Sequence, residues 1–387
     1  MSAETINGAR IVLETLHRLG VTDMFGYPGG AVIPIYDEIY SFPEIKHYFV
    51  RHEQGAAHAA DGYARVSGRV GVCLATSGPG ATNLVTGIMT AYMDSVPMVA
   101  ITGQVGRPFI GKDSFQEADI QGITMPITKH NYLVQDIHDL PRIIKEAYFI
   151  AGTGRPGPVL IDIPKDIQTE KISMTEYNKL YEVPIQLEGY DPTYKGHQGQ
   201  IKKAATLIKN AKRPLIIAGA GVLKSGAVDE LKALAETAHI PVTNTLVGLG
   251  GFPGDHELAL GMVGMHGSVA ANNSTDEADL VIAAGIRFHD RITGHPDFFC
   301  KKAKIIHIDI DPAEIDKNVT IDVPIVGDLK RVLTELNALV EPAKHEAWLE
   351  QIRQWQEEYP IVVPESTDGE LHPQYVLSEL NKIVKDD

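Results

Sequence analysis

Cysteine is scarce in this sequence. Of 387 residues only Cys73 and Cys300 are cysteines, and they lie far apart along the chain. Two such residues provide neither a disulfide framework nor a cysteine-based zinc cluster. Long apolar runs are missing as well, because the longest, such as Pro214–Gly221 and Leu280–Gly285, have the length of a strand and are too short to cross a bilayer.

Positive charge is also in short supply. Acidic residues outnumber lysine and arginine by 50 to 35, which gives a formal net charge of −15. A chain with this balance is not expected to bind nucleic acid or an anionic membrane surface. Residues 1–20 show helical spacing of apolar positions and no apolar core of a secretion signal, so the sequence predicts a cytoplasmic protein.

What remains is the composition of an ordinary soluble globular protein, with 44% hydrophobic and 22% charged residues. Short apolar segments with the character of strands alternate with helical stretches through most of the chain. This alternation predicts an α/β protein with doubly wound, mostly parallel sheets. The segments expected as strands are Val21–Phe25, Lys46–Val50, Val70–Ala75, Met98–Thr102, Val159–Ile163, Leu215–Ala218, Leu280–Ala284, Ile305–Ile310 and Pro324–Val326.

The length predicts two to three domains. We expect a first domain over residues 1–170, a linker over 171–198 where helical and strand periodicity disappears, and a second domain over 199–342. Residues 343–387 contain an amphipathic helix around Trp348, a Pro-containing segment and a last helix over Pro373–Lys385. No strand follows that helix, so we interpret this part as the start of a third domain.

One carboxylate stands at a predicted junction between a strand and a helix. Glu53 opens a helix with an unusually small face, which includes Ala56 and Ala60. A glutamate in the first turn of a helix is often only a capping charge. A catalytic group is the alternative, and the spacing alone does not decide between them.

Two glycine-rich loops invite a search for phosphate sites. Ser77-Gly78-Pro79-Gly80 lies between a strand and a helix, but no Gly-Lys-Ser/Thr follows, so a tight turn is as good an interpretation as an anion cradle. Gly219-Ala220-Gly221 follows a strand and lacks the third glycine of the dinucleotide pattern.

The second domain has charged side chains after its strands. Arg287 and Arg291 follow the strand Leu280–Ala284, where α/β proteins bind ligands, and they could clamp a phosphate or carboxylate or simply form surface ion pairs. Asp309 and Asp311 end the next strand and could accept hydrogen bonds from ribose hydroxyls. The pattern favours a nucleotide-like ligand. The histidines lack the spacing of metal ligands, so we expect no metal site in this chain.

Taken in order, these segments resemble one known family. The motifs are Tyr27-Pro28-Gly29-Gly30-Ala31, Arg51-His52-Glu53-Gln54-Gly55-Ala56, Ser77–Asn83, Asp113-Ser114-Phe115-Gln116-Glu117, Ile127–Tyr132, Ile161–Asp166, Gly264-Met265-His266-Gly267, Arg287–Gly294 and His307–Glu314. Together they are similar to the catalytic (large) subunits of acetolactate synthase, also called acetohydroxyacid synthase, over essentially the whole chain.

The resemblance implies a thiamine diphosphate enzyme that decarboxylates pyruvate and joins the product to a second 2-oxoacid, pyruvate or 2-oxobutyrate, in the biosynthesis of branched-chain amino acids. Glu53 matches the glutamate that shares a proton with N1′ of the aminopyrimidine. The positions that match the surroundings of the pyrimidine ring are Tyr27, Pro28, Thr76, Pro79, Asn83 and Gln116. Those that match the substrate channel are Gly30, Ala31, Phe115 and Lys165. In this interpretation Glu53, Gln116, Gly30 and Lys165 form the catalytic set.

The same resemblance implies FAD in the second domain, with a role in structure rather than in redox chemistry. The matching positions are Arg155, Gly219, Gly221, Thr245, Leu246, Gly264, Met265, His266, Gly267, Gly285, Arg287, Arg291, His307, Asp309, Ile310, Asp311 and Asp328. It further implies a homodimer or tetramer of catalytic subunits and a small regulatory subunit as a possible partner.

The sequence departs from the family in three places. Gly106 stands where the family usually has proline, and His289 replaces a usual aspartate beside the flavin. The Gly-Asp-Gly…Asn pattern that holds the diphosphate and Mg2+ does not occur; Pro253-Gly254-Asp255-His256 is only an echo of it. We therefore expect the chain alone to bind thiamine diphosphate poorly and to be inactive. Two alternatives stay open: another thiamine diphosphate carboligase or oxidase, and a non-catalytic FAD-binding fragment.

Overall fold

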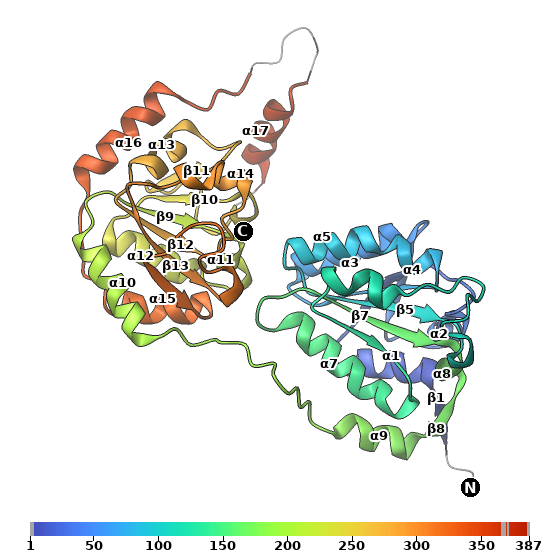
Figure 1. Ribbon diagram of the computed structural model, residues 1–387. Helices are drawn as coiled ribbons and strands as arrows, with labels where there is room; N and C mark the ends of the chain where they lie inside the picture. The colour runs from blue at the N-terminus through green and yellow to red at the C-terminus, as the bar shows by residue number, and fades with distance from the viewer. Residues whose placement is uncertain (1–3, 365–368, 370, 385–387) are drawn as a thin grey trace. The chain divides into compact units, whose positions relative to one another are not determined.

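A computed structural model describes residues 4–364, 369 and 371–384 of the chain. The chain forms two compact units, unit 1 up to Pro192 and unit 2 from Thr193 onward (Figure 1). Each has its own sheet and its own helices, coloured blue to green in unit 1 and green to red in unit 2. Among the described residues no helix is long and apolar enough to span a membrane.

Unit 1 is built on a six-stranded sheet in which every neighbouring pair runs parallel. In the spatial order β3-β2-β4-β5-β7-β6, the connection from β2 leads to β3 on one side, whereas β4 and β5 follow on the other side of β2. This change in the side of the connections creates a switch point between β2 and β4 at the carboxyl edge of the sheet. A separate antiparallel pair, β1 with β8, joins the start of the unit to its end. The strands are β1 Thr5–Asn7, β2 Asp23–Gly26, β3 Lys46–Phe49, β4 Gly71–Ala75, β5 Met98–Gln104, β6 His130–Leu133, β7 Pro158–Pro164 and β8 Lys171–Ser173.

Helices cover both faces of this sheet, as the expected crossovers require. Helices α3, α4 and α5 pack on one face and α1 and α7 on the other. The two faces have separate cores: mainly alanine, with Leu84 and Ile88, under α3 and α5, and larger aliphatic side chains under α1 and α7. The α-helices of unit 1 are α1 Gly8–Arg18, α2 Ile33–Tyr40, α3 Glu53–Ser67, α4 Pro79–Asn83, α5 Val85–Met93, α6 Ile120–Thr124, α7 Leu140–Gly152, α8 Lys165–Thr169 and α9 Met174–Glu182.

The linker expected over residues 171–198 is only partly irregular. Its first part forms β8 and α9, which complete unit 1, and regular structure is missing only from Val183 to His197. Strand β8 has no local signal because its three residues pair with β1, more than 160 positions earlier, in the register Thr5↔Ser173. Tyr190 then anchors the irregular segment, since its hydroxyl contacts Thr153 and the ammonium group of Lys129.

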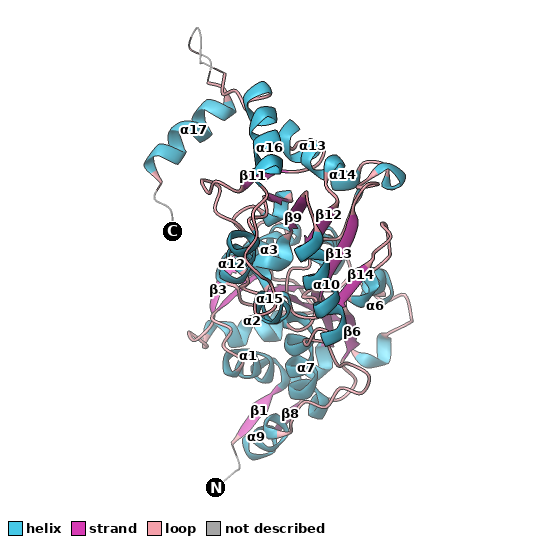
Figure 2. Ribbon diagram, turned by 90° about the vertical axis from the view of Figure 1, so that its left-hand side faces the viewer, coloured by secondary structure: helices cyan, strands magenta, loops and turns pink. Residues whose placement is uncertain are grey.

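Unit 2 repeats the architecture with a second six-stranded, fully parallel sheet in the order β11-β10-β9-β12-β13-β14. Helices α10, α12 and α15 pack together on one side, and α13 and α16 on the other (Figure 2). The elements are α10 Gln198–Asn210, β9 Pro214–Ala218, α11 Ala220–Lys224, α12 Val228–Ala238, β10 Val242–Asn244, β11 Ala259–Met262, α13 Val269–Glu277, β12 Leu280–Ala284, α14 Asp290–Thr293, β13 Lys304–Asp309, β14 Val323–Val326 and α15 Leu329–Asn337.

The sheets confirm the predicted fold class, and the C-terminal segment follows its expected course. Helix α16 (Glu346–Glu358) buries Trp348 and Ile352 against unit 2, and the indole of Trp348 donates to the carbonyl of Pro214. Helix α17 (Pro373–Ile383) follows, while Lys385, the expected end of that helix, lies outside the described residues. No side chain of α17 is buried in the described part of the chain.

Candidate functional site

The predicted site residues of unit 1 meet at one edge of its sheet. Each follows a strand, and because the strands are parallel their carboxyl ends share an edge. The residues are Tyr27, Pro28 and Gly30 after β2, Glu53 after β3, Thr76, Pro79 and Asn83 after β4, Phe115 and Gln116 after β5, and Lys165 after β7. The structure thus brings together positions that are spread over 139 residues of sequence, from 27 to 165.

Glu53 is a buried acid among the predicted residues of this edge. It is the first residue of α3, and only 9% of it is exposed. The His52 side chain caps the helix by accepting from the backbone N–H of Gln54. Glu53 therefore needs no capping role of its own, which removes the simplest structural explanation for a carboxylate at this position.

One oxygen of Glu53 is held and the other is left open. The Asn83 side-chain amide donates to Oε2 of Glu53 at 2.9 Å. Among the described residues no donor reaches Oε1, and the nearest glycine, Gly80, would place a Cβ at 3.2 Å from it. The lack of a side chain at Gly80 therefore keeps space in front of the free oxygen.

The turn Gly78-Pro79-Gly80 is shaped by contacts that no side chain would allow. Gly78 has φ +57°, and a Cβ on it would lie 2.5 Å from the carbonyl oxygen of Gln116. A Cβ on Gly80 would lie 2.6 Å from Thr76 Cγ2. Thr76 in turn accepts the backbone N–H of Ala31 at 3.0 Å. Three strand-end loops are thus joined around Glu53, and the glycines allow this close packing.

The loop after β5 carries two unusual residues. Gln116 has φ +56° without being glycine, and Phe115 is 87% exposed. The loop is braced from within by the Glu117 carboxylate, which accepts from the backbone N–H groups of Ser114 and Gly111. Its first part is held by Arg107, whose Nε donates at 2.7 Å to the carboxylate of Asp166, the residue that follows Lys165.

Gly106 lies in this loop with dihedral angles that suit proline, φ −57° and ψ 144°. A Cβ there would meet nothing closer than Asp166 Oδ1 at 3.6 Å, and no hydrogen bond among the described residues uses its N–H. We therefore expect Gly106→Pro to stabilise unit 1 by about 0.4–1 kcal/mol, mainly by restricting the unfolded chain. Thermal unfolding followed by circular dichroism should show a midpoint raised by roughly 1–4 °C.

Gly111→Pro is the matched control in the same loop. Gly111 has φ +77°, which proline cannot adopt, and its N–H donates to Glu117. This variant should lower the midpoint. A Gly106→Pro midpoint that falls with that of the control would contradict the backbone argument.

Sequence reasoning gave no role to a buried acid below this loop. Asp162, in the middle of β7, is 2% exposed and accepts from Thr102 Oγ1 at 2.7 Å and from Gln104 Nε2 at 2.8 Å. Burial raises the pKa of Asp162 to about 7, the two hydrogen bonds counteract this in part, and the Asp119 carboxylate raises the pKa further. A charged residue inside the apolar run Val159–Ile163 was the available sequence signal.

In unit 2 the predicted residues gather in the same way at the carboxyl edge of the second sheet. Most of them follow a strand, and Asp309 is the last residue of one. They are Gly219 and Gly221 after β9, Thr245 and Leu246 after β10, Gly264–Gly267 after β11, Gly285, Arg287 and Arg291 after β12, Asp309, Ile310 and Asp311 at the end of β13, and Asp328 after β14. Asp328 is also the N-cap of α15 and accepts from the backbone N–H of Arg331.

Glycines allow the backbone segments of this edge to touch. A Cβ on Gly219 would lie 2.2 Å from the carbonyl oxygen of Gly285, and one on Gly221 would lie 2.6 Å from the Cα of Gly285. Beside them, the buried atoms Thr245 Oγ1 and Asn244 Oδ1 have no hydrogen-bond partner among the described residues. Buried polar atoms without partners are costly, so this edge has the character of a site prepared for a polar ligand.

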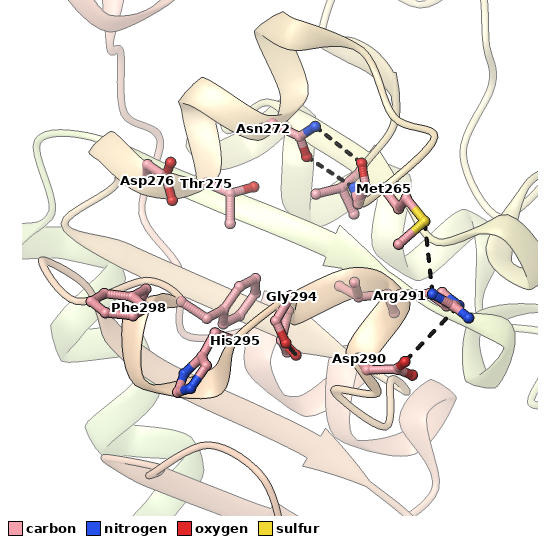
Figure 3. A pocket seen from close by; sticks show the side chains of 14 residues that line it. Met265, Asn272, Thr275, Asp276, Asp290, Arg291, Gly294, His295 and Phe298 are labelled. Atoms are coloured by element: carbon pink, nitrogen blue, oxygen red, sulfur yellow. Dashed lines mark hydrogen bonds and ion pairs between the residues drawn. The ribbon is translucent and has the colours of Figure 1, made fainter.

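A cavity of about 520 Å3 lies next to this edge, and the side chains that line it are drawn in Figure 3. Helix α13 forms one wall with Asn272, and the segment from Arg291 to Phe298 forms the other. Asn272 ties the loop in place by exchanging two hydrogen bonds with the backbone of Gly264, at 2.9 and 3.0 Å. The guanidinium of Arg291 lies 3.8 Å from the sulfur of Met265.

Two predicted residues differ in placement from the rest. His307 is fully buried inside β13, where its Nε2 lies 2.8 Å from the carbonyl oxygen of Ile286 and burial lowers its pKa. It shapes the loop below the edge rather than lining it. Arg155 belongs to unit 1, just before β7, at the amino edge of that sheet, and its Nε donates to Ser95.

Comparison with known families matches each unit separately. Residues 6–123 match the model of the thiamine pyrophosphate enzyme N-terminal TPP binding domain. Residues 201–336 match the model of the thiamine pyrophosphate enzyme central domain. The first match covers Glu53 and its partners, and the second covers the glycine-rich edge of unit 2.

Curated relatives are similar along the whole chain. Acetolactate synthase large subunits from Mycobacterium tuberculosis and Corynebacterium glutamicum are each 50% identical to it, over 100% and 99% of this chain. The large subunit from Porphyra purpurea is 49% identical over 98% of this chain. The matched region covers 63%, 61% and 65% of these relatives respectively, so the chain spans under two thirds of their length.

Proposed function

The chain belongs to the thiamine pyrophosphate enzyme family, and from that membership we propose that it serves as the catalytic subunit of an acetolactate synthase. The reaction is decarboxylation of pyruvate followed by joining of the remaining two-carbon unit to a second 2-oxoacid, pyruvate or 2-oxobutyrate. The observation that carries the proposal is the state of Glu53: buried, with Oε2 held by Asn83 and Oε1 open.

The residues of unit 1 fit the aminopyrimidine end of thiamine diphosphate. The space before Oε1 of Glu53 is kept by Gly80, and a hollow of about 540 Å3 on the same edge is lined by Tyr27, Phe49 and Arg51. The rings of Tyr27 and Phe49 lie 5.2 Å apart and offer an apolar surface to a flat heterocycle. Thr76, Pro79 and Gln116 border the same space in this proposal.

When bound, thiamine diphosphate would supply the nucleophilic carbon and the electron sink that decarboxylation of a 2-oxoacid requires. Glu53 would hold a proton at its open Oε1 and share it with N1′ of the aminopyrimidine. Asn83 fixes the orientation of that carboxyl group through its 2.9 Å hydrogen bond. Gly30, Phe115 and Lys165 would bound the substrate channel, with the exposed Lys165 ammonium group available to a carboxylate.

The diphosphate end requires a cation and oxygen ligands. Among the described residues no group of three or more His, Cys, Asp or Glu side chains could hold a metal ion. We propose that Mg2+ is held outside these two units, in a third domain of the enzyme. On this basis the 387-residue chain by itself binds the cofactor weakly.

FAD is the second cofactor that we propose. The edge of unit 2 fits it by two observations: backbone segments brought together by Gly219, Gly221 and Gly285, and the unpartnered buried oxygen of Thr245. Arg291 and Met265 would contact the flavin from the cavity wall, and Asp309 would face its ribose or ribityl hydroxyls. FAD would shape the site here and carry no electrons in the reaction.

Arg291→Ala tests the flavin site. Its guanidinium is largely exposed in the described chain and contacts only weak partners, Met265 and Asp290 at 3.8 and 3.9 Å, so a bound anion is its best partner. We expect the purified variant to retain less than half of the wild-type flavin, measured by absorbance after denaturation, because a charge-assisted contact contributes about 1.5–3 kcal/mol. Arg353→Ala, which removes an exposed arginine from α16, should retain wild-type flavin.

The reaction is tested on the gene product that carries this chain, with pyruvate, Mg2+, thiamine diphosphate and FAD. Formation of acetolactate supports the proposal. Acetate or peroxide as the main product would indicate an oxidase, and a yellow protein without turnover would indicate a flavin-binding scaffold. Gel filtration on the same preparation tests the further proposal of a cytoplasmic homodimer or tetramer, and co-purification from the source cells tests for a small regulatory subunit.

A further inference from the structure

We propose that Asp162 is a positioning residue that acts through Gln104 on the loop Val105–Asp119, and so sets Phe115 and Gln116 beside Glu53. The inference rests on the proposed function, because it gives this loop its place next to the cofactor. The hydrogen bonds of Asp162 go to Thr102 and Gln104. Its effect on the loop passes through the side chain that contacts both Asp162 and the loop backbone.

Gln104 is that side chain. Its Nε2 donates both to Asp162 Oδ2 at 2.8 Å and to the carbonyl oxygen of Ala118 at 3.0 Å. Its Oε1 accepts the backbone N–H of Val105 at 2.9 Å. The hydrogen bonds to Ala118 and Val105 hold the two ends of the loop. They also determine the orientation of the Gln104 amide, because the N–H of Val105 can only donate and the carbonyl of Ala118 can only accept.

Asp162 is held in place by the backbone of β7, and the two oxygens of its carboxylate have separate partners. It lies opposite Thr102 in the parallel pair β5–β7, and the Thr102 hydroxyl donates to its Oδ1 at 2.7 Å. All three side chains are buried, at 2%, 0% and 4% exposure for Asp162, Thr102 and Gln104. A buried network whose members are all satisfied has one favoured geometry.

The consequence reaches the site through the loop backbone. Gln116, two residues before Ala118, presses its carbonyl against Gly78, where a Cβ would lie only 2.5 Å away. Gly78 begins the turn whose helix supplies Asn83, the partner of Glu53. A loop that shifts by a fraction of an ångström would therefore change the shape of the space around Glu53.

The experiment compares four variants of the gene product that carries this chain by hydrogen exchange of the loop peptide and by affinity for thiamine diphosphate with Mg2+. Gln104→Met keeps the size of the side chain and removes its hydrogen bonds to Asp162, Ala118 and Val105. Asp162→Ala removes the carboxylate that accepts from Gln104. Asp162→Asn can still accept from Gln104 and donate to Thr102, so it should keep the loop in place. Thr102→Val removes an equally buried hydrogen bond to the same carboxylate without touching the loop, which makes it the matched control.

We expect Gln104→Met and Asp162→Ala to speed exchange of residues 105–118 by at least tenfold and to weaken cofactor binding by at least fivefold. Asp162→Asn and Thr102→Val should stay within twofold of wild type in both measurements. The proposal is overturned if Gln104→Met leaves loop exchange within twofold, or if Thr102→Val loosens the loop equally, since either result makes the network an ordinary part of the core. Should Asp162→Ala fail to fold, Gln104→Met decides alone.

The two hypotheses fail in different ways. If the gene product that carries this chain binds no thiamine diphosphate at millimolar concentration with Mg2+, the proposed function is contradicted, and loop exchange then decides the positioning role by itself. If the wild-type gene product binds the cofactor, and variants loosen the loop but keep full affinity, the link from Asp162 to the site is overturned.

Discussion

Replacing Glu53 by glutamine is expected to slow acetolactate formation by at least 100-fold while leaving the fold unchanged. The amide has the size of the carboxyl group and can still accept from Asn83, so the 2.9 Å hydrogen bond at that side can be kept. It cannot hold and return a proton at Oε1. Proton transfer by a positioned side chain contributes typically 10²–10⁴-fold to rate, which sets the scale of the loss.

The measurement is the turnover rate of the gene product that carries this chain, with flavin content and thermal midpoint recorded on the same samples. Gln54→Ala is a matched control, because it changes the adjacent residue of α3 outside the proposed proton path. Loss of turnover with unchanged flavin and midpoint assigns the effect to chemistry. Turnover of Glu53→Gln within about tenfold of wild type would show that this carboxylate is only part of the helix start.

The parallel α/β class of both sheets could be predicted from the sequence because their longest strands are continuous apolar runs followed by a turn. The strand order was not predicted, and neither were the short strands β6, β10 and β11. Strand β12 was predicted with its exact bounds, Leu280–Ala284, and β4 and β13 within one residue at each end. Once the strands are parallel, their ends share an edge, so residues such as Glu53 and Thr76 meet without any further information. The fold class alone therefore predicts that the candidate site lies at the carboxyl edge of the sheet.

What could not be predicted depends on contacts distant in sequence or on backbone angles. Strands β1 and β8 are three residues each and exist only as a pair. Nothing local marks Gln116 for a positive φ, since glutamine has no preference for that region; it is held there by the loop around it. The helical role of His52 as an N-cap was likewise hidden, because histidine is an uncommon cap.

The sequence showed that Asp162 is a carboxylate within an apolar strand, but it did not show the hydrogen bonds that this carboxylate makes. A carboxylate in an apolar strand signals a buried polar group, yet the pattern cannot say which donors lie opposite. The partner Thr102 comes from the register of β5 on β7, and Gln104 is the last residue of β5, two positions further along the same strand. A register is a property of two segments 60 residues apart, and only the structure provides it.

The second large effect that we expect is a dependence of the stability of unit 1 on pH that disappears in Asp162→Asn. The pKa of Asp162 is about 7 in the folded chain, against an ordinary value of 3.8, because the site is buried. Between these two values the unfolded chain releases a proton that the folded chain keeps. The folded state binds more protons there, so its stability falls as the pH rises from about 4 to about 7.

The size of this effect follows from the shift of about three pH units, at roughly 1.4 kcal/mol each, which gives a loss on the order of 4 kcal/mol by pH 8. Asparagine carries no proton equilibrium and keeps the shape, so Asp162→Asn should match wild type near pH 4.5 and exceed its stability increasingly up to pH 8. Asp37→Asn, at an exposed position of α2, should differ from wild type by less than about 0.5 kcal/mol at every pH.

The two units can be followed separately in one sample, which makes this measurement direct. Both tryptophans, Trp348 and Trp355, lie in α16, so tryptophan fluorescence reports the unfolding of unit 2, while far-UV circular dichroism reports both units. The gain of Asp162→Asn should appear in the dichroism transition and leave the fluorescence transition in place. A difference between variant and wild type that stays constant from pH 4.5 to 8 would mean that Asp162 is ionised in the folded chain throughout, and that Thr102 and Gln104 stabilise its charge more strongly than burial opposes it.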